Sequence, residues 1–351
     1  MADTRANPRQ EEGSRLEPRR LLSRLAGSAF IFLILAGLLI AFSILEGRAF
    51  LSGDNFLNIA VDASELLLLA VGVTFVIITA GIDLSVGSIL VLSSVIAAQT
   101  MVALSGTDQQ VQNFTYPNQA VGIPVGIAAG LLTGLVCGFI NGLLVTKLRL
   151  TPFIATLGTL GVFLGTAQIL SGGTNVPYVP PAIQTHVSTR QLLGFLPVPI
   201  AIGLVVVGVA ILALHRTQFG RYTYAIGSNA EAARRVGIDV DRHLLKVYTL
   251  SGFLAGLAGI IDVARFNTAS VGAHTLDNLA AISAAVIGGT SLFGGIGSIV
   301  GSVVGTFIPA VLRNGFVIHG VQPFWQEVAI GIVLILAVFI DQRRRSAEER
   351  M

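Results

Sequence analysis

The chain has 351 residues, of which 53% are hydrophobic and only 12% are charged, and its formal net charge at pH 7 is +3. A soluble domain carries about 25% charged residues, and a disordered chain needs low hydrophobicity together with high net charge. The composition excludes both classes and predicts an all-α integral membrane protein.

Ten apolar segments meet or approach the roughly 20 helical residues that cross a bilayer core of about 30 Å. They are Leu25–Leu45, Leu66–Ala80, Val86–Leu104, Val121–Thr146, Pro152–Leu170, Leu196–Leu214, Leu244–Ala264, Ala280–Gly294, Ser298–Leu312 and Phe324–Ile340. The second, eighth and ninth segments are short and interrupted by glycines, so we expect some of them to be broken or re-entrant helices.

Polar residues flank this apolar region at both ends. Residues 1–24 contain six arginines and are expected to form a disordered cytoplasmic tail, residues 25–341 the membrane domain, and residues 342–351 a second cytoplasmic tail. If there are ten spans and the N-terminus is inside, only Arg48, Arg190, Arg265 and Arg313 of the 22 Lys and Arg residues lie outside. The positive-inside rule therefore favours a multi-pass protein with both termini in the cytoplasm, and the basic residues indicate orientation rather than nucleic-acid binding.

Glycine recurs at every fourth residue of the segment Val121–Thr146. The row runs from Gly122 through Gly126, Gly130, Gly134 and Gly138 to Gly142. Four residues turn a helix by about 400°, so the row drifts roughly 40° per step around the helix. Small residues let helices in lipid approach closely, and the drift predicts a central helix that contacts more than one neighbour.

The sequence contains no recognisable catalytic or cofactor motif. The five histidines do not pair at metal-ligand spacing, Cys137 is the only cysteine, and there is no HExxH motif, GxSxG motif or P-loop. The chain is therefore expected to have no metal, no catalytic residues and no nucleotide site of its own. Asp83, Asp262, Asp277 and Glu327 lie near the ends of spans, where solvated carboxylates are expected and an ion-coupling relay is the alternative.

The segment Ser228–Gly237 is predicted to form a short helix between the sixth and seventh spans. Ser228 or Asn229 can cap its start, Glu231 suits the N-terminal end, Arg234 and Arg235 suit the C-terminal end, and Gly237 stops it. A helix this short needs a surface to pack on. Its small residues, Ala232 among them, favour a coupling helix that docks on a motor subunit over a helix resting on lipid headgroups.

Four stretches of this sequence resemble the ribose-type monosaccharide permeases, which are membrane subunits of ATP-binding-cassette importers. They are Gly81–Ser88 (GIDLSVGS), Ile140–Gly142 with Thr151–Thr159, Phe219–Gly237, and Leu276–Gly295 with GGTSLFGG near its end. The resemblance implies a ten-helix fold similar to that of the cobalamin importer, in the cell inner membrane. It also implies a second permease subunit, a separate ATPase that binds the ATP, and a periplasmic sugar-binding protein.

The residues that line the sugar pathway are expected to be polar and uncharged, apart from Asp83. The candidates are Asp83, Ser85, Asn141, Thr156, Gln168 and Gln326. For each of them a helix–helix hydrogen bond is an alternative role, and Asp83 could instead cap the helix that follows it. Two other functions remain open, a branched-chain amino-acid permease and an ion-coupled sugar carrier acting alone, whereas a membrane enzyme has the least support.

Overall fold

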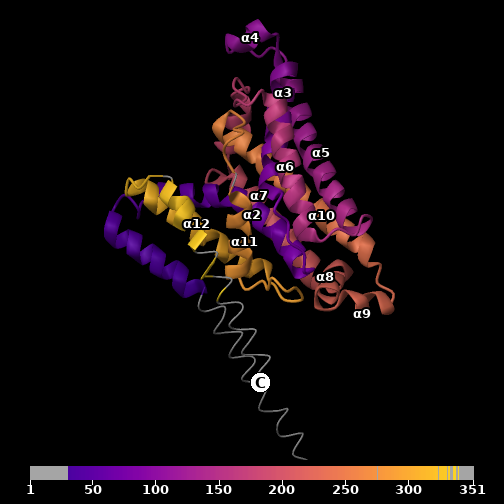
Figure 1. Ribbon diagram of the computed structural model, residues 1–351. Coiled ribbons are helices and arrows are strands. Elements are labelled where there is room, and N and C mark those ends of the chain that lie inside the picture. The colour runs from indigo at the N-terminus through magenta and orange to yellow at the C-terminus, as the bar shows by residue number, and fades with distance from the viewer. Residues whose placement is uncertain are drawn as a thin grey trace, which may run out of the picture.

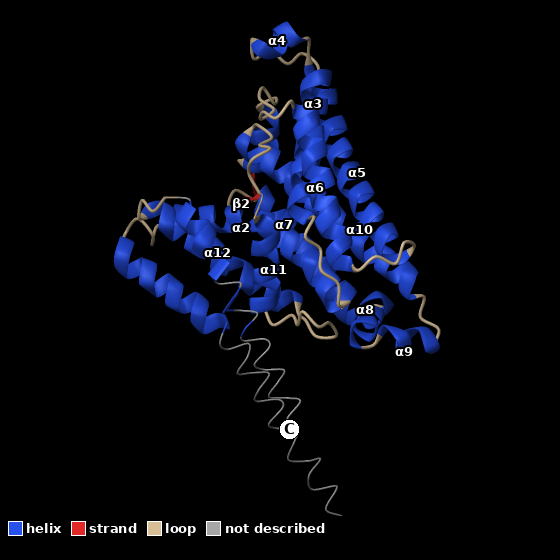
Figure 2. Cartoon of the chain, viewed as in Figure 1, coloured by secondary structure: helices blue, strands red, loops and turns tan. Residues whose placement is uncertain are grey.

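The computed structural model describes residues 31–274, 276–322, 324–329, 331, 332, 335, 336 and 339. These residues are mostly helical (Figures 1 and 2). The tails predicted at 1–24 and 342–351 lie outside the described residues.

The described helices follow one another along the chain. After a first helix, Ile31–Glu46, they are α2 Gly53–Ile78, α3 Val86–Ser105, α4 Asp108–Gln112, α5 Gln119–Thr146, α6 Pro152–Ser171, η1 Gln184–Ser188, α7 Val198–Arg216, α8 Gln218–Ser228, α9 Ala230–Arg235, α10 Val240–Phe266, α11 Asp277–Ile287 and α12 Ile299–Ile318. A two-stranded antiparallel hairpin, β1 Gln191–Leu192 and β2 Leu196–Pro197, precedes α7.

Seven of the described helices are long and apolar enough to cross a membrane, namely α2, α3, α5, α6, α7, α10 and α12. Each corresponds to one of the ten predicted spans. The first and last predicted spans are described only in part, and the described residues between 324 and 339 are helical. The all-α membrane fold is confirmed, whereas the count of ten stays a prediction.

The eighth predicted span, Ala280–Gly294, is wrong in extent. The helix there, α11, has only 11 residues, which is about 16 Å of helix and too short to cross a bilayer core. Residues 288–298 after it are not helical, because Gly288 and Gly289 end the helix, with Gly289 at a φ of +86°. The expectation of a broken helix is confirmed here, and the chain turns back so that α12 packs against α11.

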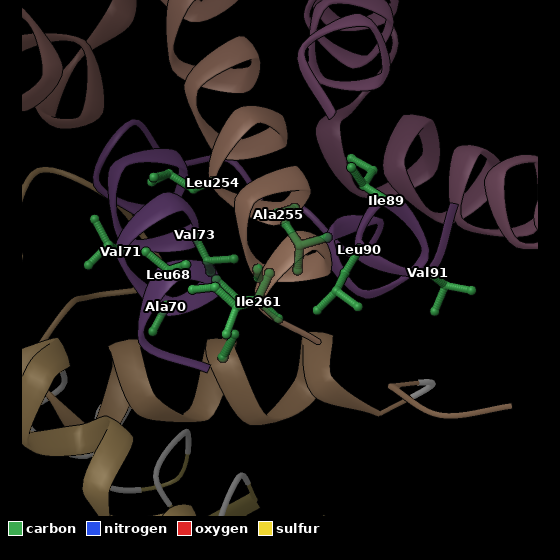
Figure 3. Packing of buried hydrophobic residues seen from close by; sticks show 14 of the residues in the cluster. Leu68, Ala70, Val71, Val73, Ile89, Leu90, Val91, Leu254, Ala255 and Ile261 are labelled. Atoms are coloured by element: carbon green, nitrogen blue, oxygen red, sulfur yellow. The ribbon is translucent and has the colours of Figure 1, made fainter. Parts of the chain in front are cut away.

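The hydrophobic core is built around α2. Figure 3 shows side chains of α2 (Leu68, Val73), α3 (Leu90) and α10 (Ala255, Ile261) meeting there, and α2 is the most buried of the candidate spans. The expectation that the glycine-rich helix is central is wrong, because burial on α5 follows its glycine-bearing face and most of its other side chains are half-buried or exposed.

The glycine row of α5 does contact two neighbouring helices, as predicted. A Cβ added at Gly126 or Gly130 would lie 2.8 or 3.0 Å from a backbone carbonyl of α3. Further along, a Cβ at Gly134 or Gly138 would lie 2.8 or 2.9 Å from the Cα of a glycine in α10. The row winds from one partner helix to the other, as the drift of about 40° per step requires.

Candidate functional site

The connection between α2 and α3 contains a buried carboxylate. Asp83 is 0% exposed. Its Oδ1 accepts hydrogen bonds from the Ser85 amide (3.0 Å) and the Ser85 hydroxyl (2.7 Å), and its Oδ2 accepts one from the hydroxyl of Ser251 on α10 (3.0 Å). Ser85 is the N-cap residue of α3, so Asp83 holds the turn before the helix rather than the first helical turn. A non-helical connection can be buried in this way because its polar groups are satisfied.

The hydrogen bonds around Asp83 continue into α5 and α6. The Asn141 amide donates to the Ser85 hydroxyl (2.7 Å) and accepts from the Thr159 hydroxyl (2.7 Å). Thr156 donates to the Ile82 carbonyl (3.0 Å). These bonds join the α2–α3 connection to α5, α6 and α10 in one buried polar network, which we call the Asp83 network.

The Asp83 network brings together four of the six predicted pathway residues, namely Asp83, Ser85, Asn141 and Thr156, and all four are fully buried. Gln168 is exposed on α6, and Gln326 is buried in the described helical residues near the C-terminus; neither is hydrogen-bonded to the network. Thr159 and Ser251 were not predicted as pathway residues. Their positions are nevertheless marked in the sequence, since Thr159 ends one of the four family-like stretches and Ser251 precedes Gly252 of the α10 glycine pair.

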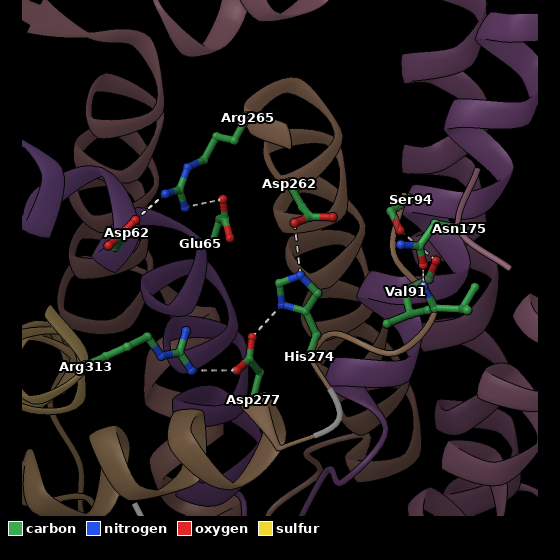
Figure 4. Close-up of polar contacts among 11 residues, drawn as sticks. Asp62, Glu65, Val91, Ser94, Asn175, Asp262, Arg265, His274, Asp277 and Arg313 are labelled. Atoms are coloured by element: carbon green, nitrogen blue, oxygen red, sulfur yellow. Dashed lines mark hydrogen bonds and ion pairs between the residues drawn. The ribbon is translucent and has the colours of Figure 1, made fainter. Parts of the chain in front are cut away.

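A second cluster consists of charged side chains from α2, α10, α11 and α12 (Figure 4). Arg265 binds Glu65 at 2.7 Å and also pairs with Asp62. The two ring nitrogens of His274 lie 2.9 Å from Asp262 and 2.6 Å from Asp277. Arg313 of α12 reaches Asp277 at 3.3 Å. These seven residues form a charged network that joins four helices and the connection carrying His274.

The prediction that Asp83, Asp262 and Asp277 are solvated carboxylates is wrong, because they are only 0%, 2% and 9% exposed. Both ring nitrogens of His274 face a carboxylate, and each can donate only when the ring is protonated. Burial lowers the pKa of His274, but its hydrogen bonds to Asp262 and Asp277 outweigh burial and raise the pKa to about 10. The carboxylates of Asp262 and Asp277 are therefore compensated by protein cations, as buried charges must be.

Glu65, Asp262 and His274 also satisfy the spacing of a metal site, since their donor atoms lie within 4.8 Å of one another. Each of the three is already ion-paired within the charged network. The arrangement is complete without a metal ion.

The predicted short helix after the sixth span is present as α9. Asn229 caps it by accepting from the Ala232 amide (2.9 Å), whereas Ser228 is the last residue of α8. Gly237 follows the helix with a φ of +88°. The charged side chains pair locally, Glu231 with Arg235 at 2.7 Å and Arg234 with Asp241 at 3.0 Å, so the exposed surface of α9 is rich in charge.

A further helix, α8, precedes α9 and was not predicted. Gly227 near its end approaches the carbonyl of Ile78 at the end of α2, where a side chain would collide with the backbone. The Ile78 carbonyl also accepts from the Gly295 amide (2.9 Å), and Tyr224 donates to the Gly297 carbonyl (2.8 Å). The α8–α9 unit therefore contacts the end of α2 and the non-helical segment 288–298.

A protein family described as a branched-chain amino acid transport system permease component matches residues 55–338. The chain belongs to this permease family. It is a transport subunit and not an enzyme, as the sequence predicts. No solved structure matches the chain, so the expected likeness to the cobalamin importer stays a prediction.

Curated relatives cover nearly the whole chain. The ribose import permease protein RbsC of Bacillus subtilis strain 168 is 43% identical over 89% of this chain and 92% of its own length. The RbsC protein of Escherichia coli K12 is 36% identical over 84% of this chain and 88% of its own. The D-allose transport system permease protein AlsC of the same strain is 37% identical over 89% of this chain and 90% of its own. The resemblance to ribose-type sugar permeases is thereby confirmed.

Proposed function

We propose that the chain is the membrane-spanning permease subunit of an ATP-binding-cassette importer for a monosaccharide or a related polyol. The observation that carries the proposal is the similarity to the ribose import permease of Bacillus subtilis, which covers 92% of that protein. Since this chain contains no P-loop, a separate ATPase subunit must supply the energy.

The α8–α9 unit supports the proposed docking of an ATPase. Arg234 and Arg235 are exposed charges, and Val236 is a large apolar side chain that is 78% exposed beside them. Six residues, Ala230–Arg235, are too few for a helix that is stable alone in water, and Ala233 packs onto Ile226 and Val240. Ala233 thus anchors the helix to its neighbours, while the exposed side chains of α9 leave its outer face accessible to a partner.

The concentration of Lys and Arg in the tails and in the region of α8–α9 supports cytoplasmic termini in the cell inner membrane. A periplasmic binding protein that delivers the sugar and a second permease copy complete the proposed assembly. ATP-driven closure of the motor pair would move α8–α9 against the end of α2 and segment 288–298, and rock the spans between inward-open and outward-open states.

A reconstituted transport assay tests this function. In vesicles that contain the chain, its partner ATPase and the matching binding protein, we expect ATP-dependent uptake of labelled D-ribose or another monosaccharide. Vesicles with the chain alone should show no uptake, even with a proton or sodium gradient. Uptake by the chain alone would replace the proposal with an ion-coupled carrier.

The description of the matching family supports one other candidate, a branched-chain amino-acid permease. The same vesicles decide between the two when labelled L-leucine replaces the sugar. We expect no leucine uptake, because the RbsC and AlsC proteins, which match most of this chain, are named for sugars.

Charge reversal on α9 should uncouple the proposed motor from transport. Arg234→Glu is expected to lower ATP-driven sugar uptake at least about tenfold, since interface hot spots are commonly worth 2 kcal/mol or more. Folding should persist, because the Arg234 side chain is 57% exposed and its ion pair lies at the surface. The measurement is uptake together with ATPase stimulation. Arg190→Glu, a charge reversal beside the β1–β2 hairpin, is the control and should change neither.

A further inference from the structure

A small cavity lies where the start of α3 meets the start of α11. Its volume is about 20 Å³, enough for about one water molecule. The lining residues are Gly87, Ser88 and Val91 of α3, Leu160 and Leu164 of α6, and His274 and Asn278. The cavity is therefore bounded by both of the polar networks, with Ser88 beside the Asp83 network and His274 within the charged network.

The amide side chain of Asn278 carries an unsatisfied acceptor. Its Nδ2 donates to the Leu84 carbonyl at 3.0 Å, which fixes the orientation of the amide. Its Oδ1 has no hydrogen-bond partner within the described part of the chain, although Asn278 is only 5% exposed. A buried carbonyl oxygen without a partner is costly unless a water or a ligand donates to it.

The other polar groups at the cavity are complementary to hydroxyl groups. Ser88 uses its hydroxyl hydrogen to donate to the Ser85 carbonyl at 2.8 Å, so the Ser88 oxygen keeps lone pairs that can accept. A hydroxyl group of a solute can therefore donate to the oxygens of Asn278 and Ser88.

The charge around the cavity disfavours an anionic solute. The charged network contains four carboxylates (Asp62, Glu65, Asp262 and Asp277) against three cations (Arg265, Arg313 and His274). It therefore has no surplus positive charge for a carboxylate group of a solute. His274 spends both ring nitrogens on Asp262 and Asp277, so it cannot donate to a ligand without losing one of these bonds.

We infer that the cavity between the starts of α3 and α11 is where the hydroxyl groups of a neutral sugar or polyol contact the permease, through Asn278 Oδ1 and Ser88 Oγ. The inference rests on the proposed function and adds the position and chemistry of the solute contact. In the conformation described here the cavity is too small for a sugar, so the solute contact would form only in another conformation.

For a sugar to enter the cavity, α3 and α11 would have to move apart. Both helices are linked to the α8–α9 unit. The α2–α3 connection begins at the end of α2, against which Gly227 packs. The far end of α11 continues into segment 288–298, whose Gly295 binds Ile78. Gly87 touches the carbonyl of His274 so closely that a Cβ would lie 2.7 Å from it, and His274 adopts a φ of +62°. A movement of α8–α9 can therefore shift α11 relative to α3 and open the contact between Gly87 and His274.

Cysteine modification in the complete reconstituted importer tests the inference. In a Cys137→Ala background, Leu164→Cys places a thiol at the cavity, and Val162→Cys places one on the same helix at a side chain that is 62% exposed. A hydrophilic methanethiosulfonate reagent, applied during ATP turnover, should lower D-ribose uptake at least about tenfold in the Leu164→Cys protein. Saturating D-ribose delivered by the binding protein should slow this inactivation, and the Val162→Cys protein should keep its uptake.

A second measurement does not depend on the labelling chemistry. Ser88→Ala removes one acceptor and should lower the maximal rate of D-ribose uptake by about threefold to tenfold, the effect of one hydrogen bond, with unchanged stimulation of the ATPase by the binding protein. If modification at Leu164→Cys leaves uptake intact or sugar gives no protection, and Ser88→Ala transports normally, the inference is overturned while the proposed function stands. If the unmodified importer transports no sugar, the proposed function itself has failed.

Discussion

Gly138→Ala is expected to destabilise the protein by at least about 2 kcal/mol, as overpacking of a tight interface does. A Cβ at this position would lie 2.9 Å from the Cα of Gly252 and closer still to the Tyr248 carbonyl. Both neighbours are backbone atoms of α10, which cannot rotate away as a side chain can. The apparent melting temperature of the detergent-solubilised protein should fall, and less monodisperse protein should be recovered by size exclusion.

Gly158→Ala on α6 is the matched control, because a Cβ there meets nothing within 4 Å. It should leave the melting temperature unchanged or slightly raised, since alanine has the higher helix propensity. An equal loss of stability in both variants would mean that the glycines of α5 do not act through close contact with α10.

Arg265→Gln is expected to cost about 3–5 kcal/mol, the usual effect of removing one partner from a buried ion pair. The Arg265 side chain is 15% exposed and the Glu65 side chain 9%. Loss of the arginine leaves the carboxylates of Asp62 and Glu65 without their cation. Thermal unfolding should show a lower melting temperature than in the unsubstituted protein.

A double-mutant cycle separates the ion pair from general damage to α10. Glu65→Gln combined with Arg265→Gln should recover part of the lost stability, because the uncompensated charge is gone. The control Arg235→Gln breaks an ion pair whose side chains are 77% and 74% exposed and should change stability little. Strict additivity of the two buried substitutions would contradict the interpretation of the network as a charge-compensated unit.

The sequence was informative wherever a local pattern had one physical meaning. The four-residue glycine spacing of α5 predicted its contact with two helices, and the order of Asn229, Glu231, Arg234 and Gly237 predicted α9, because capping and end charges act within one helical turn. The motif around Asp83 and Ser85 predicted residues that the fold brings together with Asn141 and Thr156.

The sequence was uninformative where the outcome depends on distant segments. Asp262 and Asp277 lie near the ends of their helices, and only the tertiary arrangement shows that His274 and Arg313 bury and compensate them. The apolar run Ala280–Gly294 has the hydropathy of a span, but glycine contacts with α12 permit a turn that hydropathy does not register. The unsatisfied Oδ1 of Asn278 is equally invisible in a single sequence.

In the proposed mechanism, energy reaches the chain through α9 at the cytoplasmic surface. Ala232→Cys in a Cys137→Ala background places the only cysteine of the chain on α9, where Ala232 is exposed. A membrane-impermeant maleimide should label it in inside-out vesicles, and binding of the ATPase subunit should block the labelling. Right-side-out spheroplasts should remain unlabelled. Labelling in spheroplasts, or labelling in inside-out vesicles that the ATPase does not reduce, would contradict the proposed docking of the ATPase on α9.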